Sequence, residues 1–267
     1  MRNKRKSPSQ KLVEGCLQQQ SRCYNARGLT ALNPLVMQSM ATNVKVIAID
    51  GPAASGKTVV GRALAQHLGF KYLDTGVMYR AITWLALQRS TAVDDQPALE
   101  KLALDNPVNI TGHLGENIQI GGLMVSAELR DPRVTSQVSL VSQVSGVRRA
   151  LVRQQRALAE AGEIVMVGRD IGTVVLPDAD LKVYLTASIQ ERSSRRWQEM
   201  QREGRDVELN QVIRDTEERD RLDSQRTDSP LMPAQDAWVW DTSELGVEQV
   251  VKAILDRTQK LARAPQP

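Results

Sequence analysis

Residues 44–61 read VKVIAIDGPAASGKTVVG, and this stretch decides the fold. Its apolar run at 44–49 predicts a strand, and the apolar positions at helical spacing over 59–68 predict a helix. Between them, residues 51–58 match the pattern G-x-x-x-x-G-K-[ST] of a loop that cradles nucleotide phosphates. The sequence therefore predicts a nucleoside triphosphate site between the first strand and the first helix.

The residue types of this loop suit phosphate. Gly51 and Gly56 allow backbone conformations in which successive N–H groups point at an anion, and the helix dipole adds positive charge. We expect Lys57 to reach the β- and γ-phosphates and the Thr58 hydroxyl to bind Mg²⁺. A chance match in a surface turn is the alternative, and the strand before and the helix after count against it. The residues expected to bind the nucleotide are Gly51, Pro52, Ala53, Ala54, Ser55, Gly56, Lys57 and Thr58.

The positive charge of the chain is concentrated at its start. The 267 residues carry a formal net charge of +4, yet residues 1–43 alone hold seven basic residues against one acidic residue. The other 224 residues carry 28 bases and 30 acids. The folded part is therefore not globally basic, and we expect no nucleic-acid partner. No apolar run approaches the ~20 residues of a membrane helix, so we expect no membrane partner either.

Residues 1–43 show no sustained helical or alternating pattern. They lack the apolar segment of a secretory signal, whereas a transit peptide and a nucleic-acid-binding tail remain alternatives. We favour a disordered or spurious leader, since Met37 and Met40 lie just before the first strand. Cys16 and Cys23 also lie here, and we expect inert thiols in a reducing, cytoplasmic compartment.

Strand and helix patterns alternate after the phosphate loop, which is typical of a parallel sheet flanked by helices. Residues 106–133 interrupt this alternation with short strand-like pieces between glycine turns, so we expect a small antiparallel sheet inserted there. The predicted strands lie at 70–73, 108–110, 117–120, 123–125, 164–167, 181–185 and 237–240, and the predicted helices at 77–88, at 133–160 with a break near Gly146, at 189–205, at 208–222 and from Val247 onward.

Charged clusters follow several of these strands, where ligands bind in sheets of this kind. Arg80 comes one turn after Asp74-Thr75-Gly76, which follow the strand at 70–73, and Gly168-Arg169-Asp170 follow the strand at 164–167. Arginine binds phosphate well because its planar fork donates two hydrogen bonds. For the arginines of 192–205 and 219–226, a solvated helix face or surface salt bridges remain the alternative.

The residues from 44 onward resemble the bacterial cytidylate kinase family of nucleoside monophosphate kinases. The segments that carry the resemblance are IAIDGPAASGKT (47–58), YLDTGVMYRA (72–81), VSLVSQVSGVRRALVRQQR (138–156), VMVGRDIGTVVLPDADLKVYLTAS (165–188) and ERDRLDSQR (218–226). The resemblance implies a P-loop α/β domain at 44–267, with a monophosphate-binding insert at about 75–146 and a helical lid at about 189–205. Ser145 departs from it, because the family has proline at this position, three residues before Arg148.

The resemblance also implies roles for single residues. It places Lys57, Arg169, Arg192, Arg195 and Arg196 at the transferring phosphate, and Arg80 and Arg169 at the acceptor phosphate. It implies that Thr75, Ser139, Arg148 and Asp170 contact cytosine, and that Arg219, Asp223 and Arg226 hold the ribose and phosphate side.

The resemblance therefore implies transfer of the γ-phosphoryl group of ATP to CMP or dCMP, and we expect Mg²⁺ as cofactor, small nucleotides as partners and a monomer. A kinase for another monophosphate such as UMP is one alternative. A P-loop switch module is another, although it would need no second phosphate site and would leave Arg80 and Arg169 without a role. Asp170 has two interpretations as well. It accepts a hydrogen bond from the amino group of cytosine, or it only orients Arg169 through a salt bridge.

Overall fold

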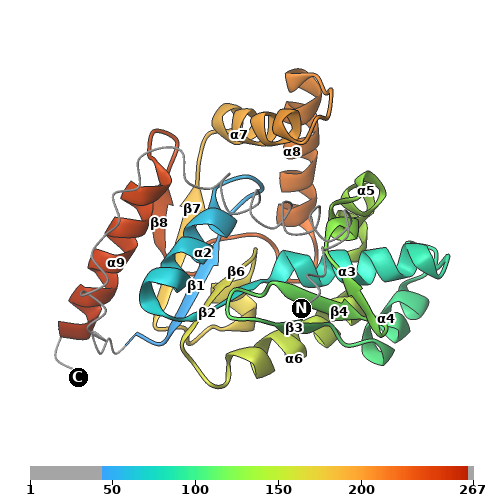
Figure 1. Cartoon of the computed structure of the whole chain (residues 1–267), viewed down its shortest axis with the longest axis horizontal. Coiled ribbons are helices and arrows are strands. Elements are labelled where there is room, and N and C mark those ends of the chain that lie inside the picture. The colour runs from blue at the N-terminus through green and yellow to red at the C-terminus, as the bar shows by residue number, and fades with distance from the viewer. Residues whose placement is uncertain (1–43, 264–267) are drawn as a thin grey trace, which may run out of the picture. The chain divides into compact units, whose positions relative to one another are not determined.

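The computed structural model describes residues 44–263, so the expectations for residues 1–43 and their two cysteines lie outside the described part. In chain order the helices and strands are β1 (Val46–Asp50), α2 (Lys57–Leu68), β2 (Lys71–Asp74), α3 (Thr75–Gln88), α4 (Gln96–Asp105), β3 (Asn109–Thr111), β4 (Asn117–Ile120), β5 (Leu123–Val125), α5 (Pro132–Val141), α6 (Ser145–Ala159), β6 (Ile164–Val167), β7 (Leu181–Thr186), α7 (Ile189–Arg202), α8 (Leu209–Gln225), β8 (Trp238–Asp241) and α9 (Val247–Arg263) (Figure 1).

The predicted α/β fold is confirmed. Five strands form a sheet in the order β2-β6-β1-β7-β8, and every neighbouring pair is parallel. Ile49 of β1 lies beside Val167 of β6 and Val183 of β7, so these strands end at the same edge. The loop after β1, the turn after β6 and the connection from β7 to α7 therefore lie close together.

Alternating side chains divide the core between the two faces of this sheet. Ala48 and Met166 belong to a buried cluster with α3, α4, α5 and α6. Ile47, Ile49 and Val167 belong to a second cluster, with α2 and α9. Every one of these side chains is at most 1% exposed, as period-two alternation in a sheet covered on both faces requires.

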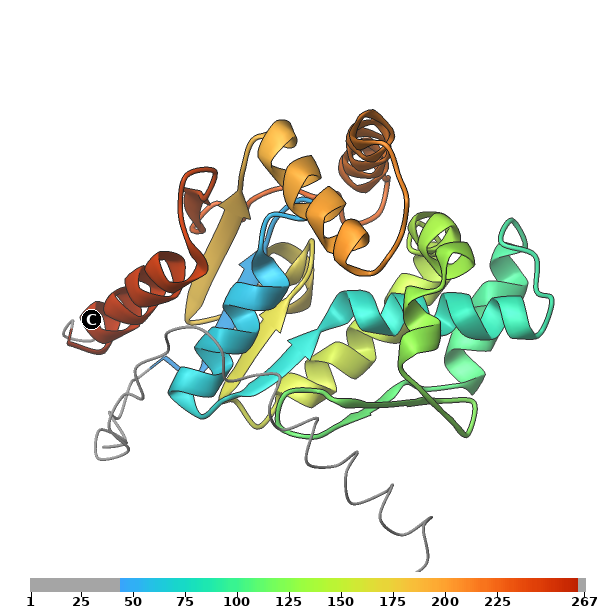
Figure 2. The same cartoon turned by 45° about the horizontal axis from the view of Figure 1, so that its top comes forward.

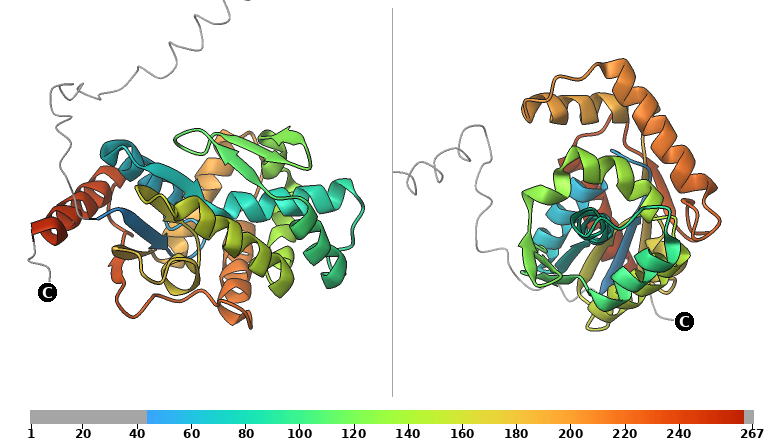
Figure 3. Two further views of the ribbon diagram at one scale, coloured as in Figure 1. Left: turned by 90° about the horizontal axis from the view of Figure 1, so that it is seen from below. Right: turned by 90° about the vertical axis from the view of Figure 1, so that its right-hand side faces the viewer.

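The insert holds the expected antiparallel sheet, in the order β3-β4-β5, apart from the parallel sheet (Figure 3). Its core is continuous with the α3 side of the parallel sheet, because Ile118 and Ile120 of β4 share a cluster with Met166. The predicted helical break near Gly146 falls at 142–144, between α5 and α6. Helix α4 was missed by the pattern analysis.

Helices α7 and α8 pack together beside the phosphate loop, as Figure 2 shows. Ser188 caps α7 by accepting a hydrogen bond from the Glu191 amide at 3.2 Å. The Trp197 indole donates to the Val207 carbonyl at 2.8 Å and ties α7 to the turn that precedes α8. None of the described helices is both long and apolar enough to cross a membrane.

Candidate active site

The phosphate loop connects the end of β1 to the start of α2. Gly51 has φ +147°, and a Cβ there would lie 2.0 Å from the Leu185 carbonyl oxygen, so the loop passes β7 at a distance that only glycine permits. Gly56 caps α2 in the left-handed region, with φ +90°. The backbone thus takes the shape that exposes the first amides of α2 to an anion.

Lys57 is buried and folded back onto this loop. Its Nζ donates to the Pro52 carbonyl at 2.5 Å and to the Ser55 hydroxyl at 3.2 Å. Burial first, and then the positive charge of Arg169, hold the pKa of Lys57 well below its usual range. Arg219 acts in the same direction, which places the lysine beside a second group of cations.

Two oxygen-bearing side chains of the kind that bind metal ions meet at the start of α2. The Thr58 hydroxyl donates to Asp74 Oδ2 at 3.0 Å, and the second oxygen of Asp74 caps α3 by accepting from the Gly76 amide at 3.0 Å. One hydroxyl and one carboxylate beside a phosphate loop are the kind of donor set that Mg²⁺ uses, since it keeps several waters and takes few protein ligands. These residues fit the ion. Among the described residues no cluster of three or more His, Cys, Asp or Glu side chains offers an all-protein metal site.

Beyond Lys57 the structure gathers the arginines that the sequence pattern placed after different strands. Arg80, on α3, donates to the Leu129 carbonyl and the Thr135 hydroxyl, both at 3.0 Å. Arg219, on α8, is half-buried, and its Nε is shielded from solvent without a hydrogen-bond partner within residues 44–263. Neither guanidinium forms an ion pair in the part of the chain that the structure describes.

Burial lowers the pKa of both guanidinium groups, and other arginines lie near enough for their charges to lower it further. Burial, followed by the charge of Arg169, lowers the pKa of Arg219 to about 10, and Arg80 and Arg196 also contribute. Burial, followed by the charge of Arg196, lowers the pKa of Arg80. Arg169 is partly neutralised by Asp223 at 2.8 Å and Arg196 by Glu199 at 2.6 Å. We call Arg80, Arg169, Arg196 and Arg219 the arginine cluster. Its charge is only partly compensated within residues 44–263, which makes it a candidate anion site.

A buried network of charges lies next to this cluster. Arg148 and Asp170, at most 4% exposed, form an ion pair, and Arg226 lies 3.5 Å from the other oxygen of Asp170 and 3.9 Å from Asp223. Asp170 therefore pairs with Arg148 and Arg226. The interpretation that it orients Arg169 is wrong, because Asp223 is the partner of Arg169.

The other two residues expected to contact the cytosine base, Thr75 and Ser139, have different hydrogen-bond partners. The Thr75 hydroxyl donates to the Val167 carbonyl at 3.0 Å, so its oxygen can act toward other groups only as an acceptor. Ser139 lies near the end of α5, half-buried, and its carbonyl accepts from the Ser142 hydroxyl at 2.9 Å. The hydrogen bonds of Ser139 thus join it to the turn before α6, and it forms none with the charged network.

The three arginines expected in the lid separate into two groups. Arg192 donates to the Ala187 and Ala53 carbonyls and pairs with Asp220, and Arg195 donates to Glu191 and to the Thr242 carbonyl. Both therefore bind protein groups. Arg196 is the lid residue that belongs to the arginine cluster.

Sequence reasoning missed three carboxylates. Asp50 is buried at the end of β1 and accepts from the Ile171 and Gly172 amides at 2.8 and 2.7 Å, which fixes the turn that carries Arg169 and Asp170. Asp74 was quoted within a motif without a role, although its place before a helix start is a capping signal. Asp220 bridges α8 to the phosphate loop, a long-range contact that no local pattern reveals.

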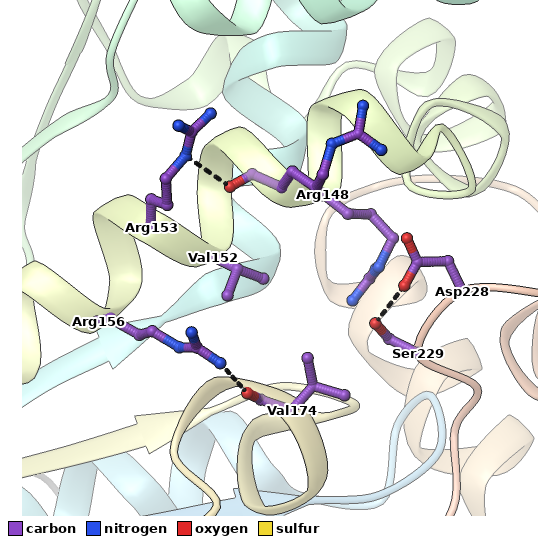
Figure 4. Close-up of a pocket in the computed structure, with 8 residues that line it drawn as sticks. Arg148, Val152, Arg153, Arg156, Val174, Asp228 and Ser229 are labelled. Atoms are coloured by element: carbon purple, nitrogen blue, oxygen red, sulfur yellow. Dashed lines mark hydrogen bonds between the residues drawn. The ribbon is translucent and has the colours of Figure 1, made fainter.

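Arg148 also forms one wall of an outer pocket of about 440 Å³, drawn in Figure 4. There Arg156 donates to the Val174 carbonyl at 2.7 Å, and Ser229 donates to Asp228 at 2.8 Å. The pocket lies between α6 and the segments around 174 and 228, and none of the phosphate-loop residues lines it. The residues that line it are Arg148, Arg149, Val152, Arg153, Arg156, Val174, Asp228 and Ser229.

Comparison with known proteins decides the family. Residues 47–260 match the model of the family described as cytidylate kinase. The chain belongs to the cytidylate kinase family. Among its relatives, the cytidylate kinases of Pelotomaculum thermopropionicum and Rhodococcus opacus are each 47% identical to it, over 79% and 81% of this chain and 94% and 95% of theirs. The cytidylate kinase of Desulforamulus reducens is 46% identical over 82% of this chain and 99% of its own length.

Proposed function

We propose that this protein transfers the γ-phosphoryl group of ATP to CMP or dCMP, giving ADP and CDP or dCDP. The observation that carries the proposal is the pairing of two anion sites, the phosphate loop and the arginine cluster, close enough for Arg169 and Arg219 to lower the pKa of Lys57. A binding module that only hydrolyses or senses a nucleotide needs one such site. A kinase with a phosphate acceptor needs two.

In the reaction an oxygen of the acceptor phosphate forms a bond to the γ-phosphorus, while the bond from that phosphorus to the β,γ-bridging oxygen breaks and ADP leaves. The acceptor phosphate is itself the nucleophile, so no general base is required. The protein's task is to hold two polyanions in line and to neutralise the charge between them. In this proposal Lys57 and the arginine cluster supply that neutralisation. Mg²⁺, when bound at Thr58 and Asp74, would add further neutralisation of the ATP phosphates.

The base would lie against the charged network. The Thr75 oxygen is available as an acceptor, because its proton is used on the Val167 carbonyl. A carboxylate is likewise acceptor-only, so Thr75 and Asp170 favour the amino group of cytosine over the carbonyl of uracil. Arg148, held by Asp170, supplies the donors for the acceptor atoms of the ring. A mismatch at buried polar groups is costly, which is how such a site discriminates.

The domain division belongs to the same proposal. Residues 75–146 would bind the monophosphate and residues 189–205 would cover the phosphates, with the core of 44–267 holding ATP. The active unit in this proposal is a monomer.

The test is a coupled assay of ADP release with CMP, dCMP, UMP and AMP as acceptors at equal concentration. We expect kcat/KM for CMP or dCMP to exceed that for UMP and AMP by at least tenfold. ADP release that does not depend on any acceptor would refute the proposal, and so would equal use of UMP.

A further inference from the structure

Helices α7 and α8 together hold Ala53, the third residue of the phosphate loop, by both of its backbone groups. The Ala53 amide donates to Asp220 Oδ1 at 3.1 Å, and the Ala53 carbonyl accepts from Arg192 at 3.0 Å. Arg192 and Asp220 pair with each other through the second oxygen of the carboxylate. The three residues form a closed ring of contacts, although they come from the loop, α7 and α8.

The ring is anchored to the parallel sheet. Arg192 is 7% exposed, and its Nε donates to the Ala187 carbonyl at 2.9 Å, just beyond the end of β7. The next loop residue, Ala54, has φ +57°, a conformation that L residues rarely adopt and that persists where surrounding contacts impose it. Contacts that fix Ala53 therefore help to impose the loop shape on which the phosphate-facing amides depend.

Helix α8 connects this ring to the arginine cluster. Arg219 is a member of the cluster, and Asp223, one turn later on α8, pairs with Arg169 of the cluster. Asp220 directly follows Arg219 on the same helix. A shift of α8 that brings Arg219 toward an acceptor phosphate also moves the carboxylate that holds Ala53. The two sites thus share one rigid element whose position both ligands can bias.

We propose that Arg192 and Asp220 are positioning residues that clamp the phosphate loop in its ATP-binding shape, and that α8 thereby makes ATP affinity depend on occupancy of the arginine cluster. This proposal rests on the proposed function for the identity of the two nucleotides. Neither residue touches a substrate in this scheme, and each acts through Ala53.

The test is calorimetric titration with a non-hydrolysable ATP analogue, in the absence and in the presence of saturating CMP. We expect Asp220→Ala to weaken binding of the analogue by about 10- to 100-fold, the usual loss for a hydrogen bond to a charged group. Binding of CMP alone should stay within about twofold, since the cytosine network and Arg219 are intact. Asp220→Asn keeps an acceptor for the Ala53 amide and should recover part of the affinity.

Asp215→Ala is the matched control, because Asp215 lies on the exposed side of the same helix and accepts from Gln211. It should leave both affinities and the Tm unchanged. In the wild type CMP should tighten analogue binding, and the ratio of Kd values without and with CMP should fall toward one in Asp220→Ala.

Several results would overturn the clamp. One is an Asp220→Ala protein that folds and binds the analogue like the wild type. Equal weakening of CMP and analogue together with a lowered Tm would show a purely structural role, and a wild-type ratio of one would refute the link through α8. If Asp220→Ala does not fold, Asp220→Asn and Arg192→Lys are judged by the same ratios. These titrations need no turnover, so an absence of CMP phosphorylation would count against the proposed function and leave the clamp to be decided separately.

Discussion

Lys57 is the single residue through which the loop meets the transferring phosphate in our proposal. Lys57→Ala should lower kcat by about 10² to 10³, the size of comparable electrostatic contributions, while the Tm stays unchanged. Stability is spared because the substitution removes a buried charge whose pKa burial already depresses. Steady-state kinetics and thermal melting check both parts. Lys101→Ala, which removes an exposed partner of Asp105, is the control, and near-normal turnover in Lys57→Ala would refute the role of the lysine.

In our proposal Asp170 decides the choice of base. Asp170→Asn can turn an amide donor toward the uracil carbonyl, so the ratio of kcat/KM for CMP to that for UMP should fall by at least tenfold. The same change also weakens the pairing with Arg148 and Arg226, and that loss affects both substrates alike. The ratio separates the two effects. An unchanged ratio, with both substrates impaired, would leave Asp170 only the role of holding its arginines.

Asp50 gives the protein a pH-dependent stability. Burial raises its pKa from the ordinary 3.8 to about 6, although the amides of Gly172 and Ile171 act against this. A carboxyl with a raised pKa stabilises the fold while it is protonated, and this contribution is lost as the pH rises from about 4 through about 6. The shift corresponds to roughly 3 kcal/mol of unfolding free energy.

Asp50→Asn mimics the protonated form at every pH. Its stability relative to the wild type should therefore increase by up to that amount between pH 4 and pH 7, as measured by urea unfolding. Asp105→Asn, at an exposed carboxylate, should show no such trend. A stability difference that does not change with pH would mean that Asp50 titrates normally in the fold.

At the scale of the elements, close packing of α2 on the sheet holds the loop. A Cβ at Gly61 would lie 2.5 Å from Val167 Cγ1 and 3.1 Å from Tyr72 Cε2. We expect Gly61→Ala to destabilise the protein by about 1–3 kcal/mol, because overpacking outweighs the better helix propensity of alanine. Gly246→Ala is the control, since a Cβ there meets nothing closer than 3.6 Å. Equal Tm values for the two variants would contradict this account.

The elements also show which parts of the fold could be predicted from the sequence and which could not. The strand, loop and helix at 46–68 were predicted because their signals are contiguous and their periods differ. Helix α4 was missed because only Leu99, Leu102 and Ala103 of its ten residues are buried, although Asp95 caps it just before a proline. Single contacts such as Arg169 with Asp223, 54 residues apart, depend on how α8 packs, and no local pattern encodes that.

At the scale of the whole molecule, the arginine cluster carries positive charge that the acceptor phosphate of our proposal would neutralise. CMP at about 100 times its Kd should add about 2.7 kcal/mol of stability, a rise in Tm of roughly 5–10 °C for a protein of this size. Cytidine at the same concentration should give well under half of this shift. Differential scanning fluorimetry measures both, and equal shifts would show that the cluster does not bind the phosphate.

The same charge predicts that Arg219 lowers the stability of the protein when no nucleotide is bound. Arg219→Ala removes a half-buried cation that forms no ion pair within residues 44–263 and whose Nε has no hydrogen-bond partner there, so the unliganded variant should melt above the wild type yet lose most of its response to CMP. Arg221→Ala is the control, because Arg221 lies on the exposed side of α8 and pairs with Glu218. A variant that melts lower without ligand and responds normally to CMP would refute the assignment.

The hydrogen bond from Trp197 to Val207 has an optical consequence. The chain has four tryptophans, all within the described residues. Trp84 is buried in the core, and Trp238 and Trp240 stack with ring centroids 4.8 Å apart on the sheet edge. Only Trp197 of these four lies in the segment that we propose as the lid, where it is half-buried, and its contact with water should change if nucleotide binding moves α7. The protein therefore carries a built-in fluorophore, and a shift in its emission on nucleotide addition would time lid closure in stopped-flow experiments without any attached dye.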